Sequence, residues 1–151
     1  MNSPRAVTAR ILHRVLGGES LNKLLPHALD PAVPADRPLC QELIYGSLRQ
    51  WPYLEALSQR FLRKPLRRKD HDVLALICMG LYELLHLNTP EHAVVSETVN
   101  ACKALKKPWA TGLVNGVLRS FQRRGGNLTP PLSAAAKQAL PEWLHESLCQ
   151  E

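Results

Sequence analysis

The sequence DHDVLALICMGLYELLH, residues 70–86, decides the fold. Its apolar side chains cover nearly every face of a helix from Val73 to Leu85, and a helix that is apolar all round is buried on all sides. Asp70, which stands just before this segment, belongs to the residue types that cap helix N-termini. We therefore predict that residues 71–86 form the central helix of the domain and that Asp70 caps it.

Apolar residues repeat at helical spacing on both sides of this segment, and nowhere do they alternate as they would in a strand. Ser3 and Pro4 predict the start of the first helix, as its cap and its first turn, and Gly17-Gly18 its end. Pro52 either kinks the helix that Asp36 caps or begins a new one. The other predicted helices run through about 21–29, 37–51, 54–62, 90–105 and 110–124, with a weak last one from Ser133. The fold class that follows is all-α.

The chain carries 19 Lys and Arg against 13 Asp and Glu, a formal net charge of +6. Such a surplus favours polyanionic partners such as nucleic acid. No apolar run reaches the roughly 20 residues that span a bilayer. The N-terminal residues lack the pattern of a secretory signal. We therefore expect a cytoplasmic location and no membrane partner.

The basic residues gather in three groups, which are our candidates for RNA binding because guanidinium forks match phosphate oxygens. The alternative is a solvated surface, in which cations near helix C-termini complement the helix dipole. For the group near residues 103–124, a solvated surface explains the charges as well as RNA contact does. For the run at 60–69, it explains them less well. The candidates are Arg5, Arg10 and Arg14; Arg60, Arg63, Lys64, Arg67, Arg68 and Lys69; and Lys106, Lys107, Arg123 and Arg124.

The sequence offers no catalytic centre and no metal site. Its glycines do not form a phosphate-gripping loop after a strand, so we expect the interior ones, Gly46, Gly80 and Gly116, to allow close contact between helices. Cys40, Cys78 and Cys102 lie on apolar helix faces, where burial leaves a thiol inert. The fourth cysteine, Cys149, shows no pattern that suggests a role, and the six histidines are dispersed. Finally, we expect Trp51, Trp109 and Trp143 to be core or boundary residues, which would leave RNA no stacking platform.

Three ordered stretches, residues 41–49, 80–90 and 96–119, resemble the helical domain of the NusB family. Within that group the chain is most similar to the N-terminal domain of the RsmB (Sun/Fmu) ribosomal RNA cytosine-C5 methyltransferases. The resemblance implies a compact bundle of about seven helices over residues 1–128, followed at 129–151 by a linker and the start of a methyltransferase region. The stretch Leu140-Pro141-Glu142-Trp143-Leu144 favours this branch.

The same resemblance implies a longer enzyme that uses S-adenosylmethionine to methylate small-subunit ribosomal RNA. Family members hold their catalytic cysteines in Pro-Cys and Thr-Cys contexts in a later domain, and neither context occurs here. No cofactor is therefore expected in this chain. The residues that match the family pattern are Tyr45, Gly46, Arg49, Glu97, Asn115 and Arg119. We interpret Gly46 and Asn115 as helix-contact residues, and we expect a buried Glu97 to pair with Arg49 or Arg119, since an unpaired buried charge is costly.

The predicted function is an accessory RNA-binding domain that helps to position small-subunit ribosomal RNA for its own C-terminal methyltransferase domain. Two alternatives stay open from the sequence. One is an antitermination or protein-interaction module with a protein partner, as in free NusB. The other is an intramolecular scaffold for the catalytic domain, which an exposed apolar patch would favour.

Overall fold

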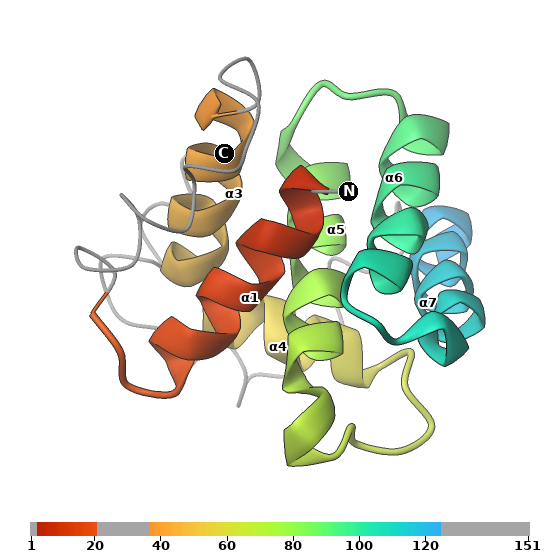
Figure 1. Ribbon diagram of the computed structural model, residues 1–151. Helices are drawn as coiled ribbons and strands as arrows, with labels where there is room; N and C mark the ends of the chain where they lie inside the picture. The colour runs from red at the N-terminus through yellow and green to blue at the C-terminus, as the bar shows by residue number, and fades with distance from the viewer. Residues whose placement is uncertain (1–2, 21–36, 125–151) are drawn as a thin grey trace.

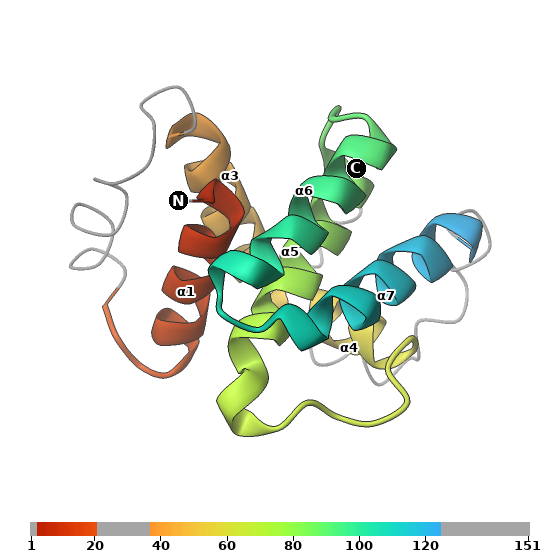
Figure 2. The same ribbon diagram turned by 45° about the vertical axis from the view of Figure 1, so that its right-hand side comes forward.

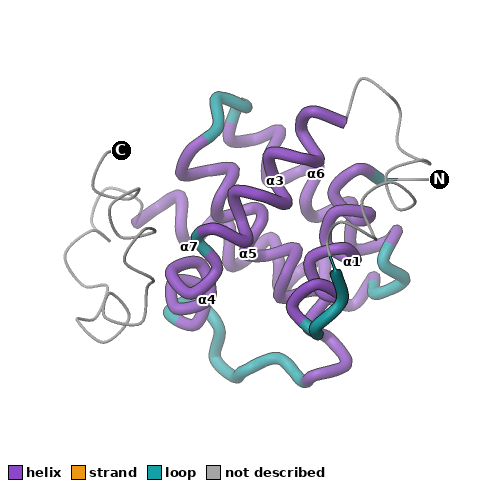
Figure 3. The backbone as a smooth tube through the Cα atoms, turned by 90° about the vertical axis from the view of Figure 1, so that its left-hand side faces the viewer, coloured by secondary structure: helices purple, strands orange, loops and turns teal. Residues whose placement is uncertain are grey.

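The computed structural model describes residues 3–20 and 37–124, and within them the chain is helical, with loops and no strand (Figure 3). This confirms the predicted all-α class. The described part holds six α-helices and two short 3-10 helices, against about seven helices predicted for the whole domain. The helices predicted near residues 21–29 and after Ser133, and the cap Asp36, lie outside the described residues. The elements are α1 (Pro4–Leu16), α3 (Arg37–Arg49), α4 (Trp51–Gln59), η2 (Arg68–Asp70), α5 (His71–His86), α6 (Glu91–Ala104), η3 (Pro108–Ala110) and α7 (Thr111–Arg124).

Helix α5 is the centre of the bundle, as predicted. It lies between α1 and α6 in Figure 1 and packs against α1, α3, α4, α6 and α7. Every residue from Val73 to Glu83 is buried, and each fully buried aliphatic side chain contributes about 1.5–3 kcal/mol. The other five helices all pack against α5, and α1 with α3 and α6 with α7 also pack against each other.

The ends of the helices agree with the sequence in most places. The Ser3 hydroxyl accepts a hydrogen bond from the Ala6 N–H at 3.3 Å, and α1 stops at Gly17. Gln50 separates α3 from α4, so Pro52, in the first turn of α4, begins a new helix rather than kinking one. The prediction for Asp70 is wrong in one respect. It stands at the N-cap position of α5 but makes no side-chain capping bond, because its carboxylate faces Lys107 instead.

Two of the three interior glycines allow close helix contact, and the third does not. A Cβ on Gly46 would lie 2.1 Å from Cζ of Tyr82, and one on Gly80 would lie 3.0 Å from a methyl group of Leu118. A side chain at position 46 would therefore displace the Tyr82 ring, whereas one at position 80 would need only a small shift of Leu118. A Cβ on Gly116 would meet no atom within 4 Å, so its predicted contact role is wrong.

The segment of residues 60–69, which joins α4 to α5, runs along one end of the bundle below α7 (Figure 2). We call it the basic segment. Among the described residues, no helix has the length and apolar character needed to cross a membrane.

Candidate nucleic-acid interface

The basic segment is held in place at several points along its length. The Phe61 ring packs edge-to-face on Phe121, with centroids 6.3 Å apart, and Leu62 and Leu66 pack partly buried against the core. The Leu66 carbonyl lies 3.3 Å from Nε2 of His71. Near its end, Nζ of Lys107 donates to the Lys69 carbonyl at 2.6 Å. These contacts order the backbone before any ligand arrives, which lowers the entropy cost of binding.

The cations of the basic segment face solvent. The exposed ones without an ion-pair partner in the described part of the chain are Arg63, Lys64, Arg67, Arg68 and Lys69. Two of the nearby acids, Asp70 and Asp72, are engaged by Lys107. Its Nζ is 3.1 Å from a carboxylate oxygen of Asp70 and 2.6 Å from one of Asp72. Partial burial opposes the charge of Lys107, yet its hydrogen bonds to Asp72 and Asp70 outweigh that effect and raise its pKa. These two acids therefore do not neutralise the segment.

A groove of about 720 Å³ separates part of the basic segment from α7. Arg63, Lys64 and Arg67 line it on one side, and Trp109, Gly112 and Gly116 on the other. Trp109 is 56% exposed, which makes the prediction of a core or boundary residue wrong for it. Only Trp51 among the three tryptophans is confirmed at the boundary, half-buried against the core, and Trp143 lies outside the described residues.

The sequence does not predict that the Trp109 ring is exposed, because tryptophan is usually a residue of the hydrophobic core or its boundary. A signal was nevertheless present. Trp109 follows Lys106-Lys107-Pro108, in the turn that separates two helical patterns, and it belongs to the apolar stripe of neither.

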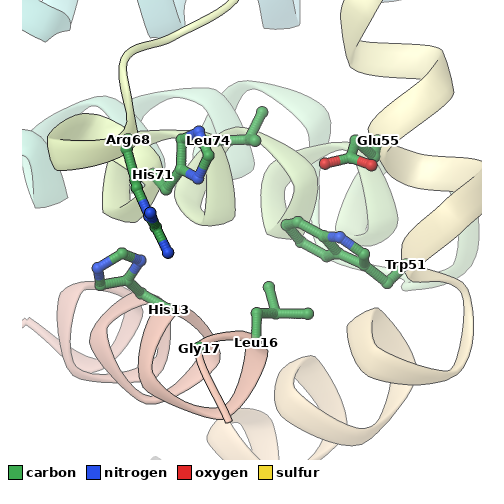
Figure 4. A pocket seen from close by; sticks show the side chains of 8 residues that line it. All are labelled: His13, Leu16, Gly17, Trp51, Glu55, Arg68, His71 and Leu74. Atoms are coloured by element: carbon green, nitrogen blue, oxygen red, sulfur yellow. The ribbon is translucent and has the colours of Figure 1, made fainter.

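Arg68 points away from this groove into a second hollow of about 360 Å³ between α1, α4 and the start of α5. Figure 4 shows its guanidinium beside the rings of His13 and His71, with Trp51 and Glu55 entering from the opposite side. A shallower hollow next to it is lined by Arg14, Glu19 and Lys69 as well as by His13 and Arg68. The fold thus brings the basic segment together with the C-terminal end of α1, which the sequence does not indicate.

The three N-terminal arginines differ in their surroundings. Arg5 is only 7% exposed and forms a bidentate pair with Glu83, Nε to Oε1 at 3.1 Å and Nη2 to Oε2 at 2.6 Å. It is therefore not available to RNA in this fold, and we remove it from the candidates. Arg10 is exposed and donates to the Ala104 carbonyl. Arg14 is exposed and pairs with Glu19, whose pKa it lowers by hydrogen bonding.

The third basic group is also divided. Lys107 is occupied by Asp70 and Asp72, so its role here is structural. Lys106 adopts a left-handed backbone with φ of 63° in the turn that ends α6, and its side chain is exposed. Nη2 of Arg123 donates to the Ser120 hydroxyl at 3.1 Å, and Arg124 is exposed at the end of α7.

The residues that match the family pattern do not form the predicted ion pair. Glu97 is exposed on α6, and Arg119 bonds one turn back along α7, where its Nε donates to Oδ1 of Asn115 at 3.0 Å. The prediction of a buried Glu97 is therefore wrong, and the helix-contact role of the half-buried Asn115 stays a prediction. Arg49 is half-buried, and its Nε has no hydrogen-bond partner. Tyr45 is exposed, and only Gly46 packs as expected.

The acid that sequence reasoning missed is Glu83. It is 1% exposed, and it is the only acidic residue in the apolar run from Val73 to Leu85. A lone acid in a helix that is buried on every side requires a buried cation. That signal pointed to an ion pair on α5.

Three thiols are buried, as predicted. Cys40, Cys78 and Cys102 are enclosed, and burial raises the pKa of Cys102 to about 11. The same cause raises the pKa of Cys78 further. The fourth cysteine, Cys149, lies outside the described residues.

Comparison with known proteins agrees with this geometry. The NusB family matches residues 2–123. "Ribosomal RNA small subunit methyltransferase B" of Pseudomonas putida is 43% identical over 97% of this chain and 34% of its own length. The protein of the same name in Pseudomonas syringae pv. tomato is 44% identical over 97% of this chain and 33% of its own length. The one in Erwinia tasmaniensis is 40% identical over 98% of this chain and 35% of its own length. The chain thus spans about a third of the length of these relatives. On the match over residues 2–123 and the all-helical bundle around α5, this chain belongs to the NusB family.

Proposed function

We propose that this chain is the RNA-binding accessory domain of an S-adenosylmethionine-dependent small-subunit ribosomal RNA (cytosine-C5) methyltransferase in the cytoplasm. Its role is to hold the ribosomal RNA substrate for a catalytic domain that corresponds to the remaining two thirds of its relatives. Residues 129–151 are the start of the connection to that domain. The proposal rests on the relatives' printed name and on the charge distribution of the basic segment.

The observation that carries the proposal is the set of five exposed cations without ion-pair partners between Arg63 and Lys69. In a surface of mere solvated charge, nearby acids are free to pair with them. Here Lys107 engages Asp70 and Asp72, and Glu19 pairs with Arg14, so none of these acids forms an ion pair with the five cations, which outnumber them at this end of the bundle. Phosphate contacts by Lys and Arg dominate the affinity of proteins for nucleic acid and make it depend on salt.

A salt titration of RNA binding tests the proposal. The 151-residue chain is titrated with a hairpin of small-subunit ribosomal RNA, and the logarithm of the affinity is plotted against the logarithm of the salt concentration. We expect the Arg67→Ala/Arg68→Ala variant to reduce the slope by roughly 1.4–1.8, since each lost phosphate contact removes about 0.7–0.9. The absence of binding at low salt would overturn the proposed function.

The matched comparison is the Arg123→Ala/Arg124→Ala variant, which removes the same charge from the end of α7. An unchanged slope in this variant, beside a reduced one in the first, assigns RNA contact to the basic segment and leaves the α7 arginines as solvated charge. Equal reductions would extend the interface to both groups. Circular dichroism of each variant establishes that the fold is retained.

A further inference from the structure

The groove between the basic segment and α7 combines an aromatic surface, free space and positive charge. Trp109 is the most exposed of the large apolar side chains in the described residues, at 56%. An indole left in water beside a helix start contributes little to the fold. What it offers is a flat surface on which another ring can stack.

Two of the α7 residues that line the groove carry no side chain. Gly112 and Gly116 lie one turn apart on α7, both are exposed, and a Cβ on either would meet nothing within 4 Å. Glycine inside a helix weakens it relative to alanine. Since neither glycine serves the packing of the domain, what the pair provides is room next to Trp109. The hollow of about 720 Å³ falls within the range of roughly 300–1,000 Å³ typical of small-ligand sites.

The opposite wall decides the chemistry of the occupant. Arg63, Lys64 and Arg67 are exposed there, and the one acid that lines the groove, Asp70, is already paired with Lys107. A protein segment would have to bring acidic side chains together with apolar ones. A nucleotide carries both required groups, an anionic phosphate and a base with an apolar face, within a single unit of the RNA chain.

We propose that this groove binds an unpaired stretch of RNA, with one base stacked on Trp109 and the flanking phosphates on Arg63, Lys64 and Arg67. The inference rests on the proposed function and adds to it the class of RNA that this part of the surface takes. Inside a duplex, the faces of the bases are covered by their neighbours, so away from the duplex ends only an unpaired base can present a face to the indole. The basic segment thus holds the backbone, and Trp109 selects single strands.

The test compares two RNA probes on the 151-residue chain, a fluorescein-labelled oligouridine of ten nucleotides and a blunt RNA duplex of ten base pairs. Trp109→Ala is expected to weaken oligouridine binding about tenfold, the usual effect of removing one stacking platform, and to leave duplex binding unchanged. Its salt slope stays as in the wild type because no charge is lost. Arg63→Ala/Arg67→Ala is expected to lower the oligouridine slope by about 1.4.

A second variant fills the groove without removing any contact. Gly116→Leu adds a side chain at a position of α7 where a Cβ meets nothing within 4 Å, and it is expected to weaken oligouridine binding as Trp109→Ala does, with circular dichroism as the check on its fold. The matched controls are Tyr45→Ala, which removes an exposed ring on α3, and Ser96→Leu, which adds the same side chain to an exposed position on α6. Neither position lines the groove, and neither variant is expected to change the affinity for oligouridine.

Three results overturn the inference, and they are distinguishable from failure of the proposed function. Unchanged oligouridine affinity in both Trp109→Ala and Gly116→Leu, with a reduced slope in Arg63→Ala/Arg67→Ala, means that RNA follows the basic segment outside the groove. Equal losses for oligouridine and duplex mean that no unpaired base stacks on Trp109. The third result concerns a full-length relative with the equivalent substitutions. If its N-terminal domain no longer associates with the rest of the protein but its RNA affinity is unchanged, the groove binds protein and not RNA. Only the absence of all RNA binding at low salt removes the proposed function as well.

Discussion

At the scale of single residues, the contact between Arg5 and Glu83 joins the first turn of α1 to the last turn of α5, 78 positions away in the chain. Both side chains are buried, and two hydrogen bonds fix their geometry. Such a pair adds little net stability over an apolar replacement, but the loss of one partner leaves an unpaired charge in a medium of low polarity. Its effect on the fold is therefore to make the register of α1 on α5 unique.

Glu83→Gln is expected to lower the free energy of unfolding by about 3–5 kcal/mol, because it leaves Arg5 charged, buried and without its partner. Urea denaturation followed by circular dichroism measures the loss. The control is Glu19→Gln, which breaks the exposed pair with Arg14 and is expected to lower the free energy of unfolding far less, because solvent screens that pair. Similar losses in the two variants would contradict this account.

Glycine to alanine substitutions at two helical positions are expected to have opposite signs. Gly46→Ala forces its Cβ into the Tyr82 ring and is expected to destabilise the domain by about 1–3 kcal/mol. Gly116→Ala meets nothing and is expected to stabilise α7 by about 0.5–1 kcal/mol. Thermal unfolding of both variants beside the wild type checks the prediction, and a lower melting temperature in Gly116→Ala would refute the open space at Gly116.

The sequence shows that a buried helix contains an acid that needs a cation more readily than it shows which residue is that cation. Glu97 and Glu83 are both acids in helical stretches, and only the three-dimensional packing places the first in solvent and the second in the core. Arg5 was assigned to a surface group for the same reason, since a periodic pattern does not say what lies across from a side chain. Trp109 shows the converse, an apolar residue that the fold leaves exposed.

At the scale of elements, the predictions were more successful because each helix carries its own pattern. The buried α5, the Ser3 cap of α1 and the separate α7 all follow from periodicity and local signals. The arrangement of the basic segment against both α7 and the end of α1 does not, because it depends on tertiary contacts such as those of Lys107. Lys107 connects the turn after α6 to the start of α5, and no pattern in the neighbouring sequence indicates this contact.

Lys107→Met is expected to lower the free energy of unfolding by about 1–2 kcal/mol at neutral pH. Because the folded-state pKa of Lys107 lies above its ordinary value of 10.5, its contribution is present below that pH and is lost as the pH rises through the folded value. The difference between wild type and variant should therefore stay constant from neutral pH up to about 10 and shrink above it. A difference that falls already between pH 7 and 9 would point to another group.

At the scale of the whole molecule, the enclosed thiols report on how the domain opens. We expect Cys40, Cys78 and Cys102 of a Cys149→Ser variant to resist a disulfide reagent at pH 8, since all three are buried and the pKa of Cys102 is about 11. In urea above the unfolding midpoint all three should react at once. Stepwise reaction below the midpoint would show that one helix detaches before the others, contrary to a bundle organised around α5.

The position of α5 also determines how the domain transmits force. Five helices share this one as their packing surface, so none of them can shift without disturbing the side chains that hold the rest. Well-packed interiors resist continuous deformation. The domain should accordingly respond to a load as a rigid body. An RNA bound to the basic segment would then be kept at a fixed distance and angle from the C-terminal end of α7, so the domain would act as a rigid spacer and would not relay a conformational signal.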